Sequence, residues 1–181
     1  PRSARNVLGH PDVDAAVLET ARGGLLREGL GFDMCDVAVV TNIGLGDHLG
    51  LNYITTVHEL AVIKRVIVQN VAPEGTAVLN ASDPVVAAMA PHCPGKVIFF
   101  ALDPSTPVLA AHRAQGKRVL YVDQGDIVCG EGRRKHRIPL ARIPLTRQGS
   151  IGFQVENAMA SIATAWALGY PWDSIETALA G

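Results

Sequence analysis

The stretch Asp36–Glu59, DVAVVTNIGLGDHLGLNYITTVHE, sets the fold class of this chain. It opens with Val37–Val40, an apolar run whose length and β-branched content are typical of a strand buried on both faces. Polar and glycine residues follow, among them Asn42, Asp47 and His48. In open parallel sheets the ligand crevice lies outside the carboxyl ends of the strands. The stretch therefore predicts one wall of a ligand site.

The same stretch ends in the start of a helix. Thr56 and Glu59 fit a capping box, and apolar residues between positions 57 and 71 keep helical spacing. Lys64 falls on that apolar stripe. It is either bent out to solvent at the edge of the stripe or held inward for a purpose.

Two further segments are predicted as strands that end in polar side chains. Asp14–Thr20 is expected to be a short buried strand that presents Glu19, and Thr76–Asn80 is expected to be followed closely by Asp83. Carboxylate, imidazole and amide groups at one sheet edge suit a magnesium–phosphate site, because Mg²⁺ prefers oxygen ligands. Taken alone, such a residue is more often a capping or structural residue than a functional one, and the prediction depends on their occurring together.

Residues 97–145 change character and predict a small antiparallel addition. Val97–Ala101 is expected to be a strand, and Arg118–Cys129 a hairpin. The basic run Arg133–Arg137 is interpreted as a solvated loop, with contact to an acidic ligand as the alternative. Ile138–Leu145 contains prolines and suits an edge strand.

The helical pattern returns at Gly152 and closes at Gly169, and Pro171–Ala180 is expected to be a last helix. The expected face of the first of these helices comprises Phe153, Ala158, Ile162, Ala165, Trp166 and Leu168. The prediction for residues 1–181 is one α/β domain, with a mostly parallel sheet flanked by helices and the antiparallel addition.

The bulk composition favours an intracellular globular domain. The chain has 181 residues, 48% of them hydrophobic, and a net charge of -1, which gives no general attraction to nucleic acid or to membranes. Cys35, Cys93 and Cys129 show no metal or disulfide spacing, and no apolar run reaches the roughly 18 residues that span a bilayer. We expect a cytoplasmic location. The absence of an initiator Met suggests a fragment.

Several nucleotide and nucleophile motifs are absent. The chain contains no GxxxxGK[ST] loop, no GxGxxG after a strand and no GxSxG elbow. This chain therefore offers no recognisable loop for a triphosphate.

Five ordered motifs carry a family resemblance: VLET (17–20), VVTNIGLGDHLG (39–50), ELAVIKRVIV (59–68), VLNASDP (78–84) and GFQVENAMA (152–160). In this order they resemble the central domain of Mur-type ATP-dependent amide ligases, a superfamily that includes folylpolyglutamate synthases. The resemblance implies a P-loop-type fold, here without its P-loop, and a central ATPase domain that is partial and inactive alone.

The resemblance also implies site residues. Glu19 matches a magnesium-binding glutamate, His48 matches a ligand of a second magnesium, and Lys64 matches a lysine that many members carry as a carbamate. Catalytic roles are expected for these same three residues.

For ATP binding, the resemblance implies Asn157, which matches the last residue of the HNxxN adenine motif, although the His and first Asn of that motif are replaced here. Asn42, Asn80 and Asp83 fall in segments that match the rest of the ATP site. In the segment that holds Asn80 and Asp83, Ser82 replaces an aspartate.

The implied reaction is ATP-driven amide formation through an acyl phosphate. The motifs PRSAR, LETARGGLLREGLGFD and GDHLGL resemble most the members that attach arginine to the aspartate side chains of a poly-aspartate backbone. The expected partners are ATP, Mg²⁺, arginine, the acidic primer and the remaining domains of the same parent, with homo-oligomers possible. The alternatives are a folylpolyglutamate- or poly-γ-glutamate-type ligase and a non-catalytic binding module.

Residues near the start form a candidate substrate site. Arg2, Ser3, Arg5 and Arg22 are assigned to it, since guanidinium groups suit carboxylates and phosphates. The arginines equally fit ordinary surface charges.

Overall fold

The computed structural model describes residues 2–43 and 56–181. The helices are α1 (Arg2–Leu8), α2 (Arg22–Glu28), α3 (Val57–Gln69), α4 (Pro84–Ala87), α5 (Pro107–Ala114), α6 (Gly152–Ala167) and α7 (Trp172–Ala180). The strands are β1 (Cys35–Val40), β2 (Val71–Asn80), β3 (Lys96–Ala101), β4 (Val119–Asp123), β5 (Asp126–Glu131) and β6 (Arg134–Pro139). Short 3-10 turns cover Ala90–His92, Leu140–Arg142 and Pro144–Thr146.

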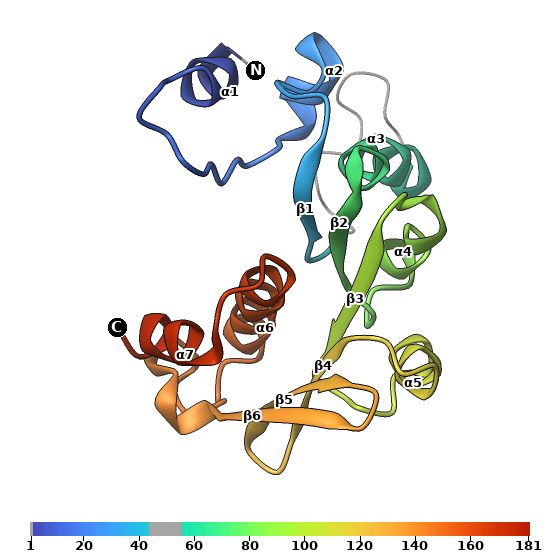
Figure 1. The fold of residues 1–181 in the computed structure, drawn as a ribbon. Helices are drawn as coiled ribbons and strands as arrows, with labels where there is room; N and C mark the ends of the chain where they lie inside the picture. Colours follow the sequence, from blue (N-terminus) through green and yellow to red (C-terminus); the bar gives the residue numbers. More distant parts are fainter. Residues whose placement is uncertain (1, 44–55) are drawn as a thin grey trace.

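The strands form one six-stranded sheet in the order β1-β2-β3-β4-β5-β6 (Figure 1). Strands β1 to β4 pair in parallel, and β4, β5 and β6 pair antiparallel. Helices α3, α4 and α5 cover one face, and α6 and α7 cover the other (Figure 1). The predicted α/β class, with a mostly parallel sheet and an antiparallel addition, is confirmed. The antiparallel pairing involves residues 119–139, because β3 pairs with β4 in parallel.

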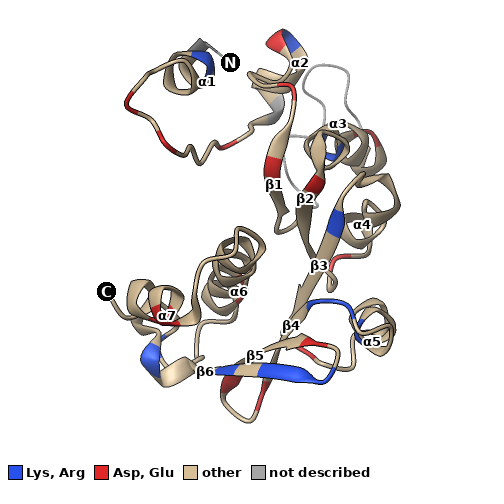
Figure 2. Cartoon of the chain, viewed as in Figure 1, with Lys and Arg blue, Asp and Glu red and all other residues tan. Residues whose placement is uncertain are grey.

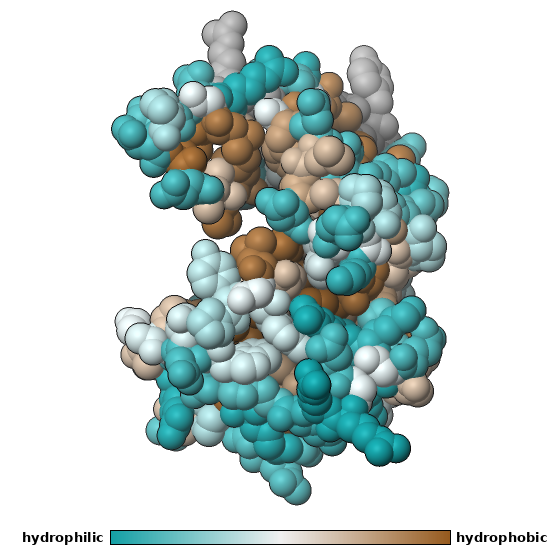
Figure 3. Space-filling view, viewed as in Figure 1, coloured by the Kyte–Doolittle hydropathy of each residue, from teal (hydrophilic) through white to brown (hydrophobic). Residues whose placement is uncertain are grey.

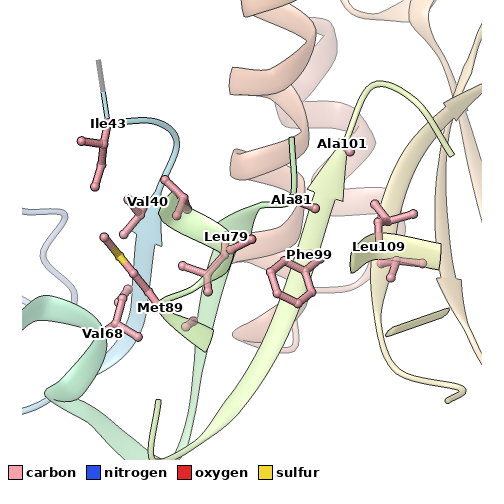
Figure 4. Close-up of a cluster of buried hydrophobic side chains, with 14 of the residues drawn as sticks. Val40, Ile43, Val68, Leu79, Ala81, Met89, Phe99, Ala101 and Leu109 are labelled. Carbon is pink, nitrogen blue, oxygen red and sulfur yellow. The ribbon is translucent and has the colours of Figure 1, made fainter. Parts of the chain in front are cut away.

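The two central strands are buried on both faces. On β2, Leu79 packs toward α3 and α4, and its neighbour Val78 packs toward α6. Phe99 and Phe100 divide in the same way on β3, because successive side chains of a strand point to opposite faces. Figure 4 shows the first of these cores, with Leu79 between Met89 and Phe99 in this view. Two hydrophobic cores therefore pack against the middle of the sheet, one on each face.

Local signals in the sequence start α3 and turn the β4–β5 hairpin. Thr56 Oγ1 accepts from the Glu59 backbone N–H at 3.2 Å, and the Glu59 carboxylate accepts from Thr56 N–H at 3.0 Å, which confirms the capping box. At the hairpin, Gln124 and Gly125 have φ of 51° and 82°. Two residues with positive φ give the turn whose twist matches paired strands.

The segment predicted as a buried strand at Asp14–Thr20 is instead exposed and has no strand partner. Residues 15–21 lack regular structure, and Val17 is 102% exposed. The segment arches away from the sheet between α1 and α2 (Figure 1). A strand needs a neighbour to satisfy its backbone, and no described strand lies beside this one. The strand prediction was therefore wrong.

Expectations for β1, for residues 133–145 and for the face of α6 also need correction. Strand β1 buries Ala38 and Val40 on one face only, and Val39 on the other face is 36% exposed. The basic run Arg133–Arg137 is not a loop, since most of it lies in β6. The edge strand therefore begins at Arg134 and ends at Pro139, ahead of the 3-10 turns. Of the expected helical face, Phe153 on α6 and Leu168 just after it are 63% and 51% exposed.

Within the described ranges, none of the helices combines the length and apolar character needed to cross a membrane.

His112 on α5 makes the fold sensitive to acid. Its Nε2 lies 3.0 Å from the Val97 carbonyl oxygen, and its ring contacts Phe99 edge-on at 4.9 Å. Burial lowers the pKa of His112, the bond to Val97 partly opposes this, and Lys117 lowers it further. The unfolded state therefore binds the proton more readily.

We predict that acidification destabilises the protein through His112. The free energy of unfolding should fall from about pH 7.5 to about pH 5 more steeply in the parent chain than in His112→Gln. Urea titrations at several pH values measure this slope. Equal slopes in the two proteins would contradict the assignment, because the other titrating groups are common to both.

Candidate functional site

The carboxyl ends of β1, β2 and β3 form a polar edge. Asn42 and Ile43 follow β1, Asn80 ends β2, and the parallel register sets Asn80 beside Phe100 of β3. The Ala81 N–H donates to the Phe100 carbonyl at 2.8 Å, which holds the turn after β2 against β3. This edge is where a parallel sheet places its ligand site.

Asp83 ties this edge together. Its Oδ2 accepts from the Ile43 N–H at 2.8 Å, so the chain leaving β1 is fixed against the chain leaving β2. Its Oδ1 accepts from the N–H groups of Val85 and Val86 at 2.9 and 3.2 Å, which caps α4. Asp83 thus shapes the edge with its own carboxylate engaged by backbone donors.

Asn80 is 5% exposed and links β2 to α6. Its Nδ2 donates to Glu156 Oε1 at 3.1 Å, and its Oδ1 accepts from the Ser82 N–H at 2.8 Å. Glu156 was missed as a site residue. No local signal in the sequence points to it, because its partner Asn80 lies 76 residues away in the chain.

The start of α6 adds an aromatic surface to the same edge. Gly152 lies against Leu102, which follows β3, and Phe153 is largely exposed. Asn157 is one turn further along, also exposed, and its amide donates to Gln154 Oε1 at 3.2 Å. A flat ring, amide groups and a carboxylate therefore lie within the first two turns of one helix.

Asn42 and Lys64 differ in their exposure to solvent. Asn42 is exposed just after β1, without a hydrogen-bond partner in the part of the chain that the structure describes. Lys64 is half-buried on α3. Its catalytic role stays a prediction.

The predicted metal ligands are not assembled by the described residues. Glu19 is exposed on the segment between α1 and α2, where it lines a hollow of about 60 Å³ with Thr20, Leu30 and Phe32. Asp47 and His48 lie outside the described residues. Among residues 2–43 and 56–181, no three His, Cys, Asp or Glu side chains cluster as a metal site.

The proposed substrate residues lie near the chain start. Arg2, Ser3 and Arg5 belong to α1, and Arg22 begins α2. No described hydrogen bond or ion pair joins Ser3 or Arg5 to the polar edge. Figure 3 shows the molecule hollowed between this N-terminal part and the part that carries α6 and α7, with hydrophobic surface on the floor of the hollow.

The Mur ligase middle domain family matches residues 4–165. The chain belongs to this family. The resemblance noted in the sequence motifs is thereby confirmed, and the polar edge at β1, β2 and α6 is part of a Mur ligase middle domain.

Cyanophycin synthetases are similar to nearly the whole of this Mur ligase domain. That of Synechocystis sp. is 46% identical over 171 residues, 93% of this chain and 19% of the relative. That of Crocosphaera subtropica is 42% identical over 177 residues, 97% of this chain and 20% of the relative. The chain thus spans about a fifth of the length of these relatives.

A solved structure supports the fold alone. MurF from Acinetobacter baumannii superposes with a TM-score of 0.53 at 19% identity, covering 80% of this chain and 28% of MurF. The Mur ligase fold is therefore shared at low sequence identity.

We predict that Asn80→Ala destabilises this Mur ligase domain by about 2 kcal/mol. The substitution removes the hydrogen bonds of the Asn80 side chain to Glu156 Oε1 and the Ser82 N–H, and leaves both groups without that partner. Asn42→Ala is the matched control, and we expect it to change the free energy of unfolding by less than about 0.5 kcal/mol. Urea denaturation of both variants measures the difference. Equal stabilities would show that the Asn80–Glu156 bond does not hold α6 on the sheet.

Proposed function

We propose that this chain is the middle domain of an ATP-dependent ligase that joins arginine to the aspartate side chains of a poly-aspartate backbone. The observation that carries the proposal is the match to cyanophycin synthetases over 93–97% of the chain. Membership of the Mur ligase middle domain family supports the use of ATP.

The proposed chemistry has two steps. The aspartate carboxylate attacks the γ-phosphorus of ATP and ADP leaves, which gives an acyl phosphate. The α-amine of arginine then attacks the acyl carbon, phosphate leaves, and the amine gives up a proton. Because the need for ATP places such an enzyme inside the cell, we also propose a cytoplasmic location.

The α6 end of the polar edge suits the nucleotide base. The exposed Phe153 ring offers a stacking surface, and the exposed amide of Asn157 offers hydrogen bonds on the same helix. Asn80 and Asp83 act indirectly, since their polar groups bind Glu156 and backbone N–H groups. They would fix the surface on which the nucleotide lies. Asn42 is exposed beside them and is free to contact it.

The described residues do not fit a magnesium ion by themselves. Glu19 lies among the residues of the N-terminal hollow, and the carboxylate of Glu156 is held by Asn80. We therefore keep Glu19, His48 and Lys64 as proposed metal-site and catalytic residues on the strength of the family motifs, and assign no step to the metal. Arg2, Ser3, Arg5 and Arg22 remain proposed contacts for the acidic substrate.

A chimera tests the proposal. The matching segment of the Synechocystis cyanophycin synthetase is replaced by this chain, and phosphate release is measured with ATP, poly-aspartate and either arginine or glutamate. We expect release only with arginine. Release with glutamate instead would contradict the proposed substrate, and no release by a folded chimera would contradict the ligase function.

In the same chimera, we predict that Glu19→Ala lowers the rate by about a hundredfold or more, because the family motif assigns this carboxylate to the site of phosphoryl transfer. Glu74→Ala removes an exposed carboxylate from β2 and should leave the rate unchanged. An equally active Glu19→Ala variant would remove Glu19 from the site.

A further inference from the structure

Strand β6 closes the sheet at the end opposite to β1 and carries an unusual concentration of cations (Figure 2). Arg133, Arg134 and Lys135 are exposed. The Gly132 N–H donates to the Gly116 carbonyl at 3.0 Å, which brings Lys117 to the same corner. We call Lys117, Arg133, Arg134 and Lys135 the basic edge. The whole chain has a net charge of only -1, so this is a local excess of positive charge.

The basic edge has no internal counter-charge within the described ranges. Glu131 lies opposite Arg134 in the β5–β6 register, but its Oε1 is 3.0 Å from Arg118 Nε. Arg118 in turn lies over the Trp166 ring at 4.5 Å. No described ion pair includes a residue of the basic edge, which leaves its charges available to a partner.

The rest of β6 is held firmly in place. His136 Nε2 lies 2.8 Å from Glu176 Oε1, and the ring stacks on Trp172 at 4.1 Å. Arg137 donates to carboxylate oxygens of Asp126 and Asp123 at 2.8 and 3.1 Å. The strand is therefore already ordered, and little conformational entropy would be lost when a partner binds it.

The outer side of β6 is open for backbone pairing. The strand pairs with β5 on one side, and no further described backbone hydrogen bond involves residues 133–139. Alternate residues of an edge strand present unpaired N–H and C=O groups, and an extended peptide can add to such an edge. Cations on an edge normally discourage pairing with neutral strands, so they would select an acidic one.

The two faces of β6 both carry free cations. Arg134 lies on the face of His136, toward α7, and Lys135 lies on the face of Arg137. An added strand would also send its side chains alternately to the two faces. A peptide that is acidic at every position therefore matches this edge better than one that is acidic at alternate positions.

We infer that the outer edge of β6 binds an acidic polypeptide in extended form, as an added strand whose carboxylates meet the basic edge. This inference deepens the proposed function and relies on it for the partner, since an acidic polymer is the proposed acceptor. The edge would hold a remote part of that polymer, on the opposite side of the sheet from β1.

Direct binding to the 181-residue chain tests the inference. Fluorescence anisotropy with labelled poly-L-aspartate compares the parent chain with Arg133→Gln/Arg134→Gln/Lys135→Gln. We expect the triple variant to bind at least about tenfold more weakly, and the affinity of the parent to fall with added salt. The matched control, Arg27→Gln/Lys96→Gln/Arg147→Gln, removes the same charge from exposed sites elsewhere and should bind like the parent.

Polyacrylate and a single-stranded DNA oligomer of similar charge serve as competitors that lack a peptide backbone. We expect both to compete poorly with poly-L-aspartate. Equal competition, equal loss in the two triple variants, or no binding by the parent would each overturn the inference. Circular dichroism melts of all variants ensure that folded proteins are compared.

The outcome is separable from that of the proposed function. If the chain binds poly-aspartate but the chimera makes no product, the binding edge on β6 is supported and the ligase function is contradicted. An active chimera with no binding at β6 would show the reverse.

Discussion

Burial of β2 and β3 on both faces is the constraint on which the rest of the structure depends. Leu79 and Phe99 face the α3–α5 layer, and Val78 and Phe100 face α6. Each of these side chains is nearly or fully buried, and burying such a residue contributes about 1.5–3 kcal/mol relative to exposure. Because apolar side chains fill both faces in the middle of the sheet, polar side chains are left mainly at its edges. Among the described residues, polar groups gather at the carboxyl edge and on the outer strand β6.

The carboxyl edge is built by polar bonds that the buried strands position. Asp83 fastens the end of β1 to the start of α4, and Asn80 fastens the end of β2 to Glu156 on α6. These bonds set Asn42 and the start of α6 on one rigid surface. The mostly parallel arrangement favours this surface as a ligand site, and we propose that the nucleotide lies there.

The sequence predicted well those elements whose signals are local. The capping box at Thr56, the Arg118–Cys129 hairpin and the apolar runs of β1 and β3 each depend on neighbouring residues. The Asn80–Glu156 bond joins residues 76 apart, so no local pattern could reveal it. Asp14–Thr20 has the composition of a strand but lacks a partner in the described sheet. Strand β6 was obscured because its charges suggested a loop, whereas its pairing with β5 decides its conformation.

Hydrogen–deuterium exchange of the chimera tests most directly the proposal that the nucleotide lies at the carboxyl edge and the start of α6. Exchange is compared with and without a non-hydrolysable ATP analogue and magnesium. We expect slower exchange in segments 41–43, 80–83 and 152–157, with no change in the β4–β5 turn at 123–126. Protection confined to other segments, in a chimera shown to bind the analogue, would contradict the proposal.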